Sequence, residues 1–236
     1  MKKIIAIAVV GAKGFVGSGL CNALAKNPDY ALVPVTRENY KAMQTGSYDV
    51  LINAAMPSGR FWAKSNPDAD YRETVEKTED LLKNWCAKKF IQISTVSART
   101  EPESVYGRHK AEAERLCDPE KHLILRLSAM YSASLTKGVL IDILSHSKVY
   151  VSGESCYPFA SLSFIADWIC RNLDRTGLVE LGAKNTVSLK EITDHLGEKI
   201  EFTGPVENQA IQNPGLDYPE ARDVFKFIDS QRVTRK

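Results

Sequence analysis

The stretch Gly11-Ala12-Lys13-Gly14-Phe15-Val16-Gly17 decides the fold. An apolar run, residues 4–10, precedes it, and residues 15–25 follow it with the apolar spacing of a helix. In a strand–turn–helix unit, the first glycine allows a tight turn, the second lets the backbone approach a pyrophosphate, and the third lets the helix pack closely on the sheet. We therefore predict that residues 11–17 bind the phosphates of a dinucleotide at the start of the helix.

Short apolar runs alternate with longer helical segments along the rest of the chain. The expected strands are residues 4–10, 31–35, 50–52, 90–93, 122–127, 149–152 and 178–181; the expected helices are residues 15–25, 68–89, 105–117, 135–146 and 161–173, with a further helical region from residue 188. This alternation predicts an α/β fold, a Rossmann-type doubly wound parallel sheet with a small C-terminal substrate-binding lobe. We assign residues 1–131 to the dinucleotide-binding core and residues 132–236 to the remaining sheet elements and the lobe, within one structural unit.

Composition excludes several classes of protein. The 31 Lys and Arg residues nearly balance 29 Asp and Glu, so charge does not favour nucleic acid or a membrane surface as a partner. The five cysteines are scattered and the histidines number four, a pattern that predicts neither disulfides nor a metal site and favours a cytoplasmic location. Residues 4–10 are too short to span a bilayer and are interpreted as a buried strand rather than a signal peptide.

The residues after the second expected strand bear on the choice of nucleotide. An acidic side chain there favours NAD by binding the ribose 2′-hydroxyl, but this chain has Thr36-Arg37. The Arg37 guanidinium suits a 2′-phosphate, and Lys13 is placed to reach the same group. The sequence therefore favours NADP over NAD; the alternative is that both cations are solvated surface charges.

Tyr106 and Lys110 lie four residues apart, on one face of an expected helix. A free tyrosine has a pKa of about 10, and a nearby cation favours its phenolate. Thr95, after the preceding strand, offers a hydroxyl to a substrate oxygen while Tyr106 transfers a proton, and Ser94 is a rival for that role. We predict Thr95, Tyr106 and Lys110 as catalytic residues, against the alternative of a solvated helix face.

Together these motifs resemble the extended branch of the short-chain dehydrogenase/reductase superfamily, the NAD(P)-dependent epimerases, dehydratases and reductases of nucleotide sugars. The matching pieces are Gly11, Gly14 and Gly17, the strand end Asn53-Ala54-Ala55, the strand end Ile93-Ser94-Thr95, the Tyr106/Lys110 pair, and residues 125–131, which include Ser128 and resemble the segment that runs past the nicotinamide.

The resemblance implies a role for each matching residue. It implies that Thr95 positions the substrate oxygen, that Tyr106 is the acid-base group, and that Lys110 binds the nicotinamide ribose and lowers the tyrosine pKa. It also implies that Asn53, Ala54, Ala55 and Ser128 contact the cofactor. The expected partner is a small-molecule substrate, a sugar nucleotide, with hydride exchange at a sugar carbon. A homodimer through residues 68–89 and 105–117 is a further expectation.

Departures from the branch leave two other hypotheses open. Thr95 and Tyr106 are only eleven residues apart, so the long substrate-facing loop is missing. The missing loop suits a second hypothesis, a reductase of a small non-nucleotide carbonyl compound. The third hypothesis is a non-catalytic dinucleotide-binding sensor. Arg60 and Trp62 are expected on a loop that either covers the sugar or packs on the surface. His109 is expected at a solvated helix position, with contact to the substrate as the alternative.

Overall fold

A computed structural model describes residues 4–233 and divides the chain into two compact units. The first unit comprises the chain up to Arg126 together with the later segment Ala166–Val179. The second unit comprises Leu127–Ile165 and the chain from Glu180 onward. The sequence predicts this change after residue 131 and does not indicate the return to the first unit. The returning segment belongs to the first unit because it accepts hydrogen bonds there, from the Tyr30 hydroxyl to the Cys170 carbonyl and from Lys89 to the Asp174 carbonyl.

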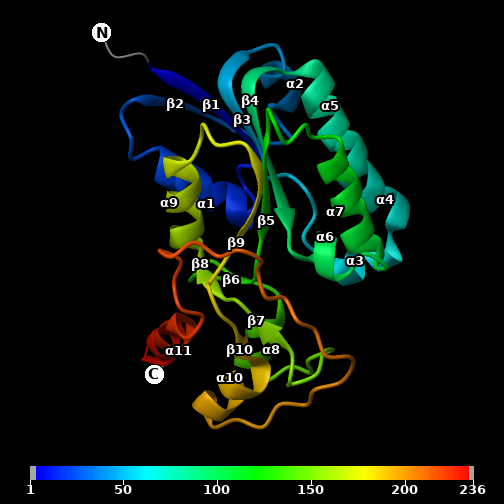
Figure 1. The fold of residues 1–236 in the computed structure, drawn as a ribbon, viewed down its shortest axis with the longest axis vertical. Coiled ribbons are helices and arrows are strands. Elements are labelled where there is room, and N and C mark those ends of the chain that lie inside the picture. The colour runs from blue at the N-terminus through cyan, green and yellow to red at the C-terminus, as the bar shows by residue number, and fades with distance from the viewer. Residues whose placement is uncertain (1–3, 234–236) are drawn as a thin grey trace. The chain divides into compact units, whose positions relative to one another are not determined.

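Six strands form one sheet in the order β2-β1-β3-β4-β5-β9 (Figure 1). Their bounds are β1 Ile5–Val10, β2 Tyr30–Val35, β3 Ser47–Asn53, β4 Cys86–Thr95, β5 Leu123–Leu127 and β9 Gly177–Leu181. β1 pairs in parallel with both β2 and β3, and β3 pairs in parallel with β4. The chain thus moves outward in both directions from β1, and ligands bind at such a switch point in α/β sheets. The predicted Rossmann-type fold is confirmed.

Helices cover both faces of this sheet, with α1 and α9 on one side and α4, α5 and α7 on the other (Figure 1). The helical elements are α1 Phe15–Leu24, α2 Tyr40–Met43, α3 Arg60–Ser65, α4 Pro67–Tyr71, the π-helical turn η1 Arg72–Glu76, α5 Lys77–Asn84, α6 Ser97–Thr100, α7 Val105–Arg115 and α9 Leu162–Arg171. A buried apolar cluster that includes Leu51, Leu81, Trp85 and Phe90 joins α5 to the sheet.

The predicted helix 68–89 is wrong at its C-terminal end. The helical chain stops at Asn84, Trp85 is extended, and β4 begins at Cys86. Residues 86–89 pair in register with β3, where Ser47 lies opposite Cys86. Backbone pairing with β3 therefore outweighs the helical spacing of a polar segment, because the peptide groups of the paired residues then find hydrogen-bond partners in the sheet.

The second unit is built on its own apolar core of residues such as Tyr131, Phe159 and Ile192. Its elements are the parallel pair β6 Met130–Tyr131 and β8 Ala160–Ser161, the antiparallel pair β7 Cys156–Tyr157 and β10 Val187–Ser188, and the helices α8 Val139–Leu144, α10 Leu189–Leu196 and α11 Asp223–Val233.

Two sequence predictions for this unit need correction. The expected strand 149–152 is reduced to an isolated bridge between Val149 and Phe202. The expected helix 135–146 is shortened to α8, which begins after Gly138 at a φ of +102°. The helical region from residue 188 is confirmed as α10, because Ser188 and Glu191 form a reciprocal capping box at its start.

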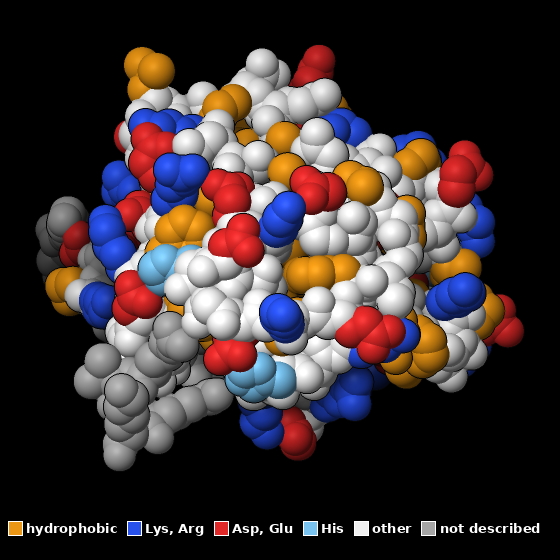
Figure 2. Space-filling model, turned by 90° about the horizontal axis from the view of Figure 1, so that it is seen from below, with side chains coloured by type: hydrophobic (Ala, Val, Ile, Leu, Met, Phe, Trp, Pro, Cys, Tyr) orange, Lys and Arg blue, Asp and Glu red, His pale blue; other side chains and the backbone are white. Residues whose placement is uncertain are grey.

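The surface of the chain is mixed in charge. Acidic and basic side chains are interspersed over the face drawn in Figure 2, in line with the nearly balanced composition. Among the described residues, every helix is too short or too polar to cross a bilayer.

Candidate active site

The glycine turn joins the end of β1 to the start of α1, and close contacts require two of its glycines. Gly11 has a φ of +84°, and a Cβ there would lie 2.6 Å from the carbonyl oxygen of Ala54. A Cβ on Gly17 would lie 2.1 Å from the carbonyl oxygen of Gly11. Any larger residue at either position would therefore displace backbone atoms of the turn.

The start of α1 offers the groups that bind phosphates. Gly14 is exposed at the N-cap and α1 has no side-chain cap. Phe15 and Val16 lie half-buried in its first turn, beside the exposed Lys13. The first N–H groups of a helix lack partners within the helix and carry partial positive charge. The cradle that the glycines leave therefore fits a dinucleotide pyrophosphate.

The residues predicted to read the ribose lie next to this cradle. The Gly11 amide donates to the carbonyl of Val35, which ties the turn to the end of β2. Arg37 is exposed there and makes no hydrogen bond or ion pair within the described chain. Lys13 instead pairs with Glu38, at 3.1 Å between Nζ and Oε1.

Glu38 is an acidic group at this position that the sequence analysis did not weigh. Hydrogen bonds from Thr36 and from the Glu38 backbone, followed by that from Lys13, lower the pKa of Glu38 to about 2. Its carboxylate is therefore available to a ribose hydroxyl, as in NAD sites. The Lys13 and Glu38 side chains are 73% and 68% exposed, and such surface pairs exchange partners at little cost. The region thus carries groups suited to either nucleotide.

The strand end Asn53-Ala54-Ala55 lies against the glycine turn. A Cβ on Gly11 would come within 2.7 Å of the Ala55 Cα, and the Ala54 amide donates to the Val10 carbonyl. The Asn53 side chain is fully buried, and its amide donates to Thr78 and Gln92 while its oxygen accepts from the Ala55 amide. Asn53 therefore holds the strand end in place from inside the protein.

Helix α7 carries Tyr106 and Lys110, and its start is well defined. The Ser104 hydroxyl caps it by accepting from the Gly107 amide at 2.9 Å. A Cβ on Gly107 would lie 2.2 Å from the Glu101 carbonyl oxygen and 2.6 Å from that of Ser97. Gly107 thus lets the α6 segment pack against the first turn of α7, which brings the end of β4 to Tyr106.

The structure separates the two candidates for the substrate-binding hydroxyl. Thr95 is half-buried; its hydroxyl accepts from the Ser97 amide at 3.3 Å and lowers the pKa of the Tyr106 phenol. Ser94 is buried and donates to Glu114 at 2.6 Å, and Arg126 binds the same carboxylate at 2.6 Å. The Ser94 hydroxyl is therefore already hydrogen-bonded to the Glu114–Arg126 ion pair. The geometry favours Thr95 as the hydroxyl that binds the substrate oxygen.

Tyr106 is buried, and its surroundings favour the protonated form of the phenol. Burial raises the pKa of Tyr106 to about 12, opposed first by the charge of Arg60 and then by the hydrogen bond with Thr95. Glu101 and Asp70 raise the pKa further. The cation that acts most on the phenol is thus Arg60, whereas the resemblance assigned this effect to Lys110.

Lys110 is only 2% exposed and is held by neutral acceptors. Its Nζ donates to the Pro57 carbonyl at 2.7 Å and to the Thr74 hydroxyl at 3.4 Å, and lies 5.0 Å from the centroid of the Tyr106 ring. Burial lowers the pKa of Lys110 to about 7, and the charge of Asp70 opposes this effect. The amine can therefore gain or lose a proton near neutral pH.

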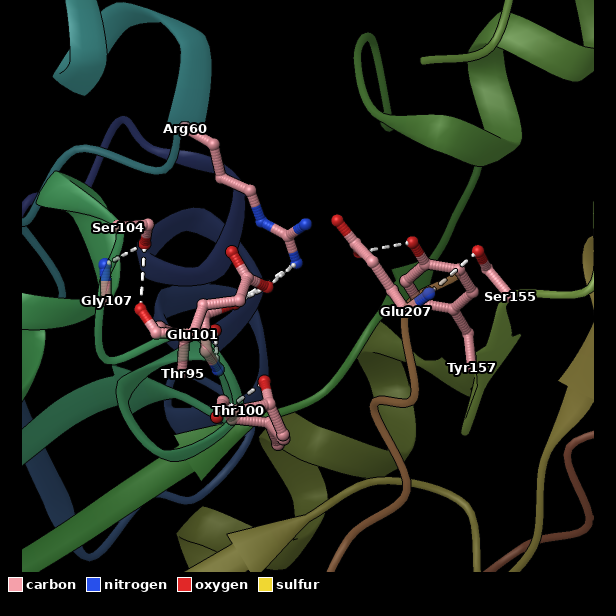
Figure 3. A network of polar contacts seen from close by, with 11 residues as sticks. Arg60, Thr95, Thr100, Glu101, Ser104, Gly107, Ser155, Tyr157 and Glu207 are labelled. Carbon is pink, nitrogen blue, oxygen red and sulfur yellow. Dashed lines mark hydrogen bonds and ion pairs between the residues drawn. The ribbon is translucent and has the colours of Figure 1, made fainter. Parts of the chain in front are cut away.

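Arg60 is a site residue that sequence reasoning left undecided. It opens α3, and its guanidinium contacts Glu101 at 2.8 Å and the Ser97 hydroxyl at 3.1 Å (Figure 3). Trp62, in contrast, is 40% exposed. The α3 segment thus supplies a cation to the site, and the ion pair with Glu101 joins it to the short connection between β4 and α7.

The expectation for His109 is wrong, because its side chain is buried. Its Nδ1 lies 2.8 Å from Oδ2 of Asp70, which is fully buried on α4. Its ring also meets that of Tyr71 edge to face, at 5.3 Å between centroids. Sequence spacing did not reveal this, since the partner is 39 residues away.

Ser128 belongs to the second unit, where it is buried. Its hydroxyl donates to the Pro158 carbonyl at 2.9 Å, and a Cβ on Gly182 would lie 2.2 Å from that hydroxyl. Its contact with a cofactor remains a prediction. Across residues 4–233, no three His, Cys, Asp or Glu side chains gather in a way that could hold a metal ion.

A lysine buried in this way is expected to destabilise the fold at pH values below the ordinary pKa of lysine. Between about pH 7 and pH 10.5 the unfolded chain holds a proton on Lys110 that the folded chain does not, so the free energy of unfolding rises with pH, by about 1.4 kcal/mol per unit. We expect Lys110→Met to be more stable than the wild type at pH 7, with the gain shrinking toward pH 10. Urea unfolding at several pH values measures this, and a gain that is constant with pH would contradict it.

The comparisons with known proteins agree with this geometry. The model of the NAD dependent epimerase/dehydratase family matches residues 7–170. A search of curated protein sequences finds no match. Among solved structures, UDP-glucose 4-epimerase of Thermotoga maritima, with UDP-glucose, is 16% identical with a TM-score of 0.77, over 98% of this chain and 100% of that one.

Two further structures carry different nicotinamide cofactors. UDP-glucuronic acid 4-epimerase of Bacillus cereus, in complex with NAD, is 19% identical with a TM-score of 0.74, over 96% of this chain and 100% of that one. The dTDP-4-dehydrorhamnose reductase of Bacillus anthracis, in complex with NADP, is 17% identical with a TM-score of 0.73, over 95% and 99%. At these identities the likeness concerns the fold. The family match and the geometry of the site together show that this chain belongs to the NAD dependent epimerase/dehydratase family.

Proposed function

We propose that this family member reduces, epimerises or dehydrates a nucleotide-linked sugar, with NADP as the preferred cofactor. The observation that carries the proposal is the cluster of Thr95, Tyr106 and Lys110 at the end of β4 and the start of α7. Its second support is the glycine cradle at the start of α1. Related folds bind UDP-sugars, NAD and NADP, as their names state.

Each residue has a task in this proposal. The cradle of residues 11–17 and Ala54-Ala55 holds the dinucleotide, whose nicotinamide supplies hydride exchange with a sugar carbon. Thr95 holds the sugar oxygen by a hydrogen bond, and Tyr106 gives a proton to it or takes one from it. With its pKa raised to about 12, the Tyr106 phenol carries its proton at neutral pH, which is the form that keto-sugar reduction requires. Lys110 binds the nicotinamide ribose through its ammonium group.

The second unit is the candidate substrate lobe in this proposal. A smaller carbonyl substrate is the alternative, and the short α6 segment between Thr95 and Tyr106 favours it, because it leaves little chain to hold a nucleotide diphosphate. A cytoplasmic location fits the free state of all five cysteines. Homodimer formation stays a prediction.

We expect NADPH to bind more tightly than NADH, since Arg37 and Lys13 can both bind a 2′-phosphate. Arg37→Ala is expected to weaken NADPH binding about tenfold and leave NADH binding nearly unchanged, in titrations that follow nicotinamide fluorescence. Glu38→Gln frees Lys13 and removes a negative charge, so we expect it to strengthen NADPH binding.

Tighter NADH binding that depends on Glu38 would instead identify an NAD enzyme. If the folded protein binds neither cofactor, the proposed function is wrong. If a cofactor does bind, turnover of keto-sugar nucleotides is compared with turnover of small aldehydes and ketones. This comparison distinguishes the two substrate classes.

A further inference from the structure

A stripe of buried polar residues runs along the helix that faces α7. Asp70, Thr74 and Thr78 recur every fourth residue through α4, η1 and α5, and all three are fully buried. Burying a polar side chain costs free energy unless it is well paired, so folding alone does not call for such a stripe. The π-helical turn η1 lies within it, and such turns are frequent at functional sites.

Two polar contacts connect this stripe to consecutive residues of α7. Asp70 Oδ2 accepts from Nδ1 of His109 at 2.8 Å, and one turn further Thr74 accepts from Nζ of Lys110 at 3.4 Å. The other oxygen of Asp70, Oδ1, is buried and has no hydrogen-bond partner within residues 4–233. A buried carboxylate with one unpaired oxygen is costly unless a cation lies close by.

Lys110 is the cation that lacks a matching anion. Its two acceptors, the Pro57 carbonyl and the Thr74 hydroxyl, are neutral. Asp70 is the charge that favours its protonated form against burial. The buried carboxylate and the buried ammonium therefore complement each other across α4 and α7.

The other charged groups near the site have partners of their own. Glu114, one turn after Lys110 on α7, binds Arg126, and Glu112 accepts from the Tyr71 hydroxyl. On the side of α3 and α6, Arg60 and Glu101 pair with each other and act on Tyr106. This leaves Asp70 as the counter-charge for Lys110 among the described residues.

We propose that Asp70, held in place by His109, is the counter-ion that keeps Lys110 protonated, and that this pair positions the catalytic ammonium. The hydrogen bond with His109 Nδ1 fixes the position of the carboxylate, and the carboxylate in turn favours the charged amine. The catalytic consequence rests on the proposed function, whereas the charge relation between Asp70 and Lys110 can be measured without cofactor or substrate.

The test is a pH titration of Lys110 by NMR in protein labelled with 13C at the lysine Cε, with the signal assigned by its loss in Lys110→Met. We expect Asp70→Asn to move the midpoint to lower pH by about one unit or more, because an adjacent opposite charge shifts a pKa by about 1–3 units. The matched control is Glu112→Gln, which also neutralises a carboxylate at the α4–α7 contact and is expected to leave the midpoint unchanged.

His109 variants test the same relation without changing Asp70. His109→Asn retains an N–H donor for the carboxylate and is expected to keep the wild-type midpoint, while His109→Ala is expected to lower it. An unchanged Lys110 midpoint in folded Asp70→Asn and His109→Ala would overturn the proposal. An equal shift in Glu112→Gln would overturn it too, since the effect would then be unspecific.

Kinetics connect the charge relation to the proposed function. If the protein turns over a substrate, we expect Asp70→Asn to move the alkaline limb of the kcat profile to lower pH, because Lys110 then loses its proton earlier. If the Lys110 midpoint shifts but no cofactor binds, the counter-ion proposal stands and the proposed function fails.

Discussion

Tyr106→Phe is expected to lower kcat by about 10²–10⁴-fold, the usual contribution of a positioned acid-base group. The substitution removes one hydroxyl from a buried ring and leaves the packing of α7 intact. Cofactor binding should stay within about twofold of the wild type, because the cradle for the dinucleotide lies at the start of α1. Single-turnover oxidation of NADPH with an accepted substrate measures the effect on the chemical step.

The control is Tyr48→Phe. Tyr48 is also buried, and its hydroxyl donates to the Met43 carbonyl at 2.6 Å, in the apolar cluster beneath α5. Its loss should cost about 1 kcal/mol of stability and leave kcat unchanged. If Tyr106→Phe retained wild-type kcat, another group would be the acid-base residue, and Tyr106 would serve packing alone.

Gly17→Ala is expected to abolish dinucleotide binding and to destabilise the fold by about 3 kcal/mol. The new Cβ would lie 2.1 Å from the carbonyl oxygen and 2.8 Å from the carbonyl carbon of Gly11, and both are backbone atoms of the turn. The clash can be relieved only if α1 moves away from the turn, which opens the phosphate cradle. Fluorescence titration with NADPH and thermal unfolding measure the two effects.

Two neighbouring substitutions test whether the effect depends on steric clash. Gly14→Ala would place a Cβ 3.2 Å from the same oxygen, a contact that a small shift relieves, so we expect a weaker effect. Ser18→Ala removes a hydroxyl that donates to the Phe15 carbonyl and adds no bulk, so cofactor binding should persist. Equal behaviour of all three variants would contradict the steric argument.

Local patterns in the sequence were sufficient for the class of fold and for the placement of most of the candidate site residues. The glycine spacing after a buried apolar run defines a strand–turn–helix unit, because few residues other than glycine tolerate a φ of +84° and backbone contacts this close. The four-residue spacing of Tyr106 and Lys110 works in the same way, since helix geometry places both on one face. Such arguments need only neighbouring residues.

Contacts between distant segments decided the rest. The start of β4 at Cys86 depended on pairing with Ser47, and the choice of Thr95 over Ser94 depended on Glu114 and Arg126. Partners of this kind lie far away in the sequence, so periodicity cannot reveal them. Element boundaries and polar pairing were therefore beyond what the sequence alone could predict.

The charges around Tyr106 and Lys110 show the same difference between sequence and structure. The sequence by itself determined that a tyrosine and a lysine lie on one face of a helix in a chain that begins with a strand, a glycine turn and a helix. Only the tertiary structure decided that Arg60 acts on the phenol and that Asp70 and His109 lie buried beside the amine. The physical reason is that a pKa depends on burial and on every charge within a few ångströms, and both are set by how the helices pack.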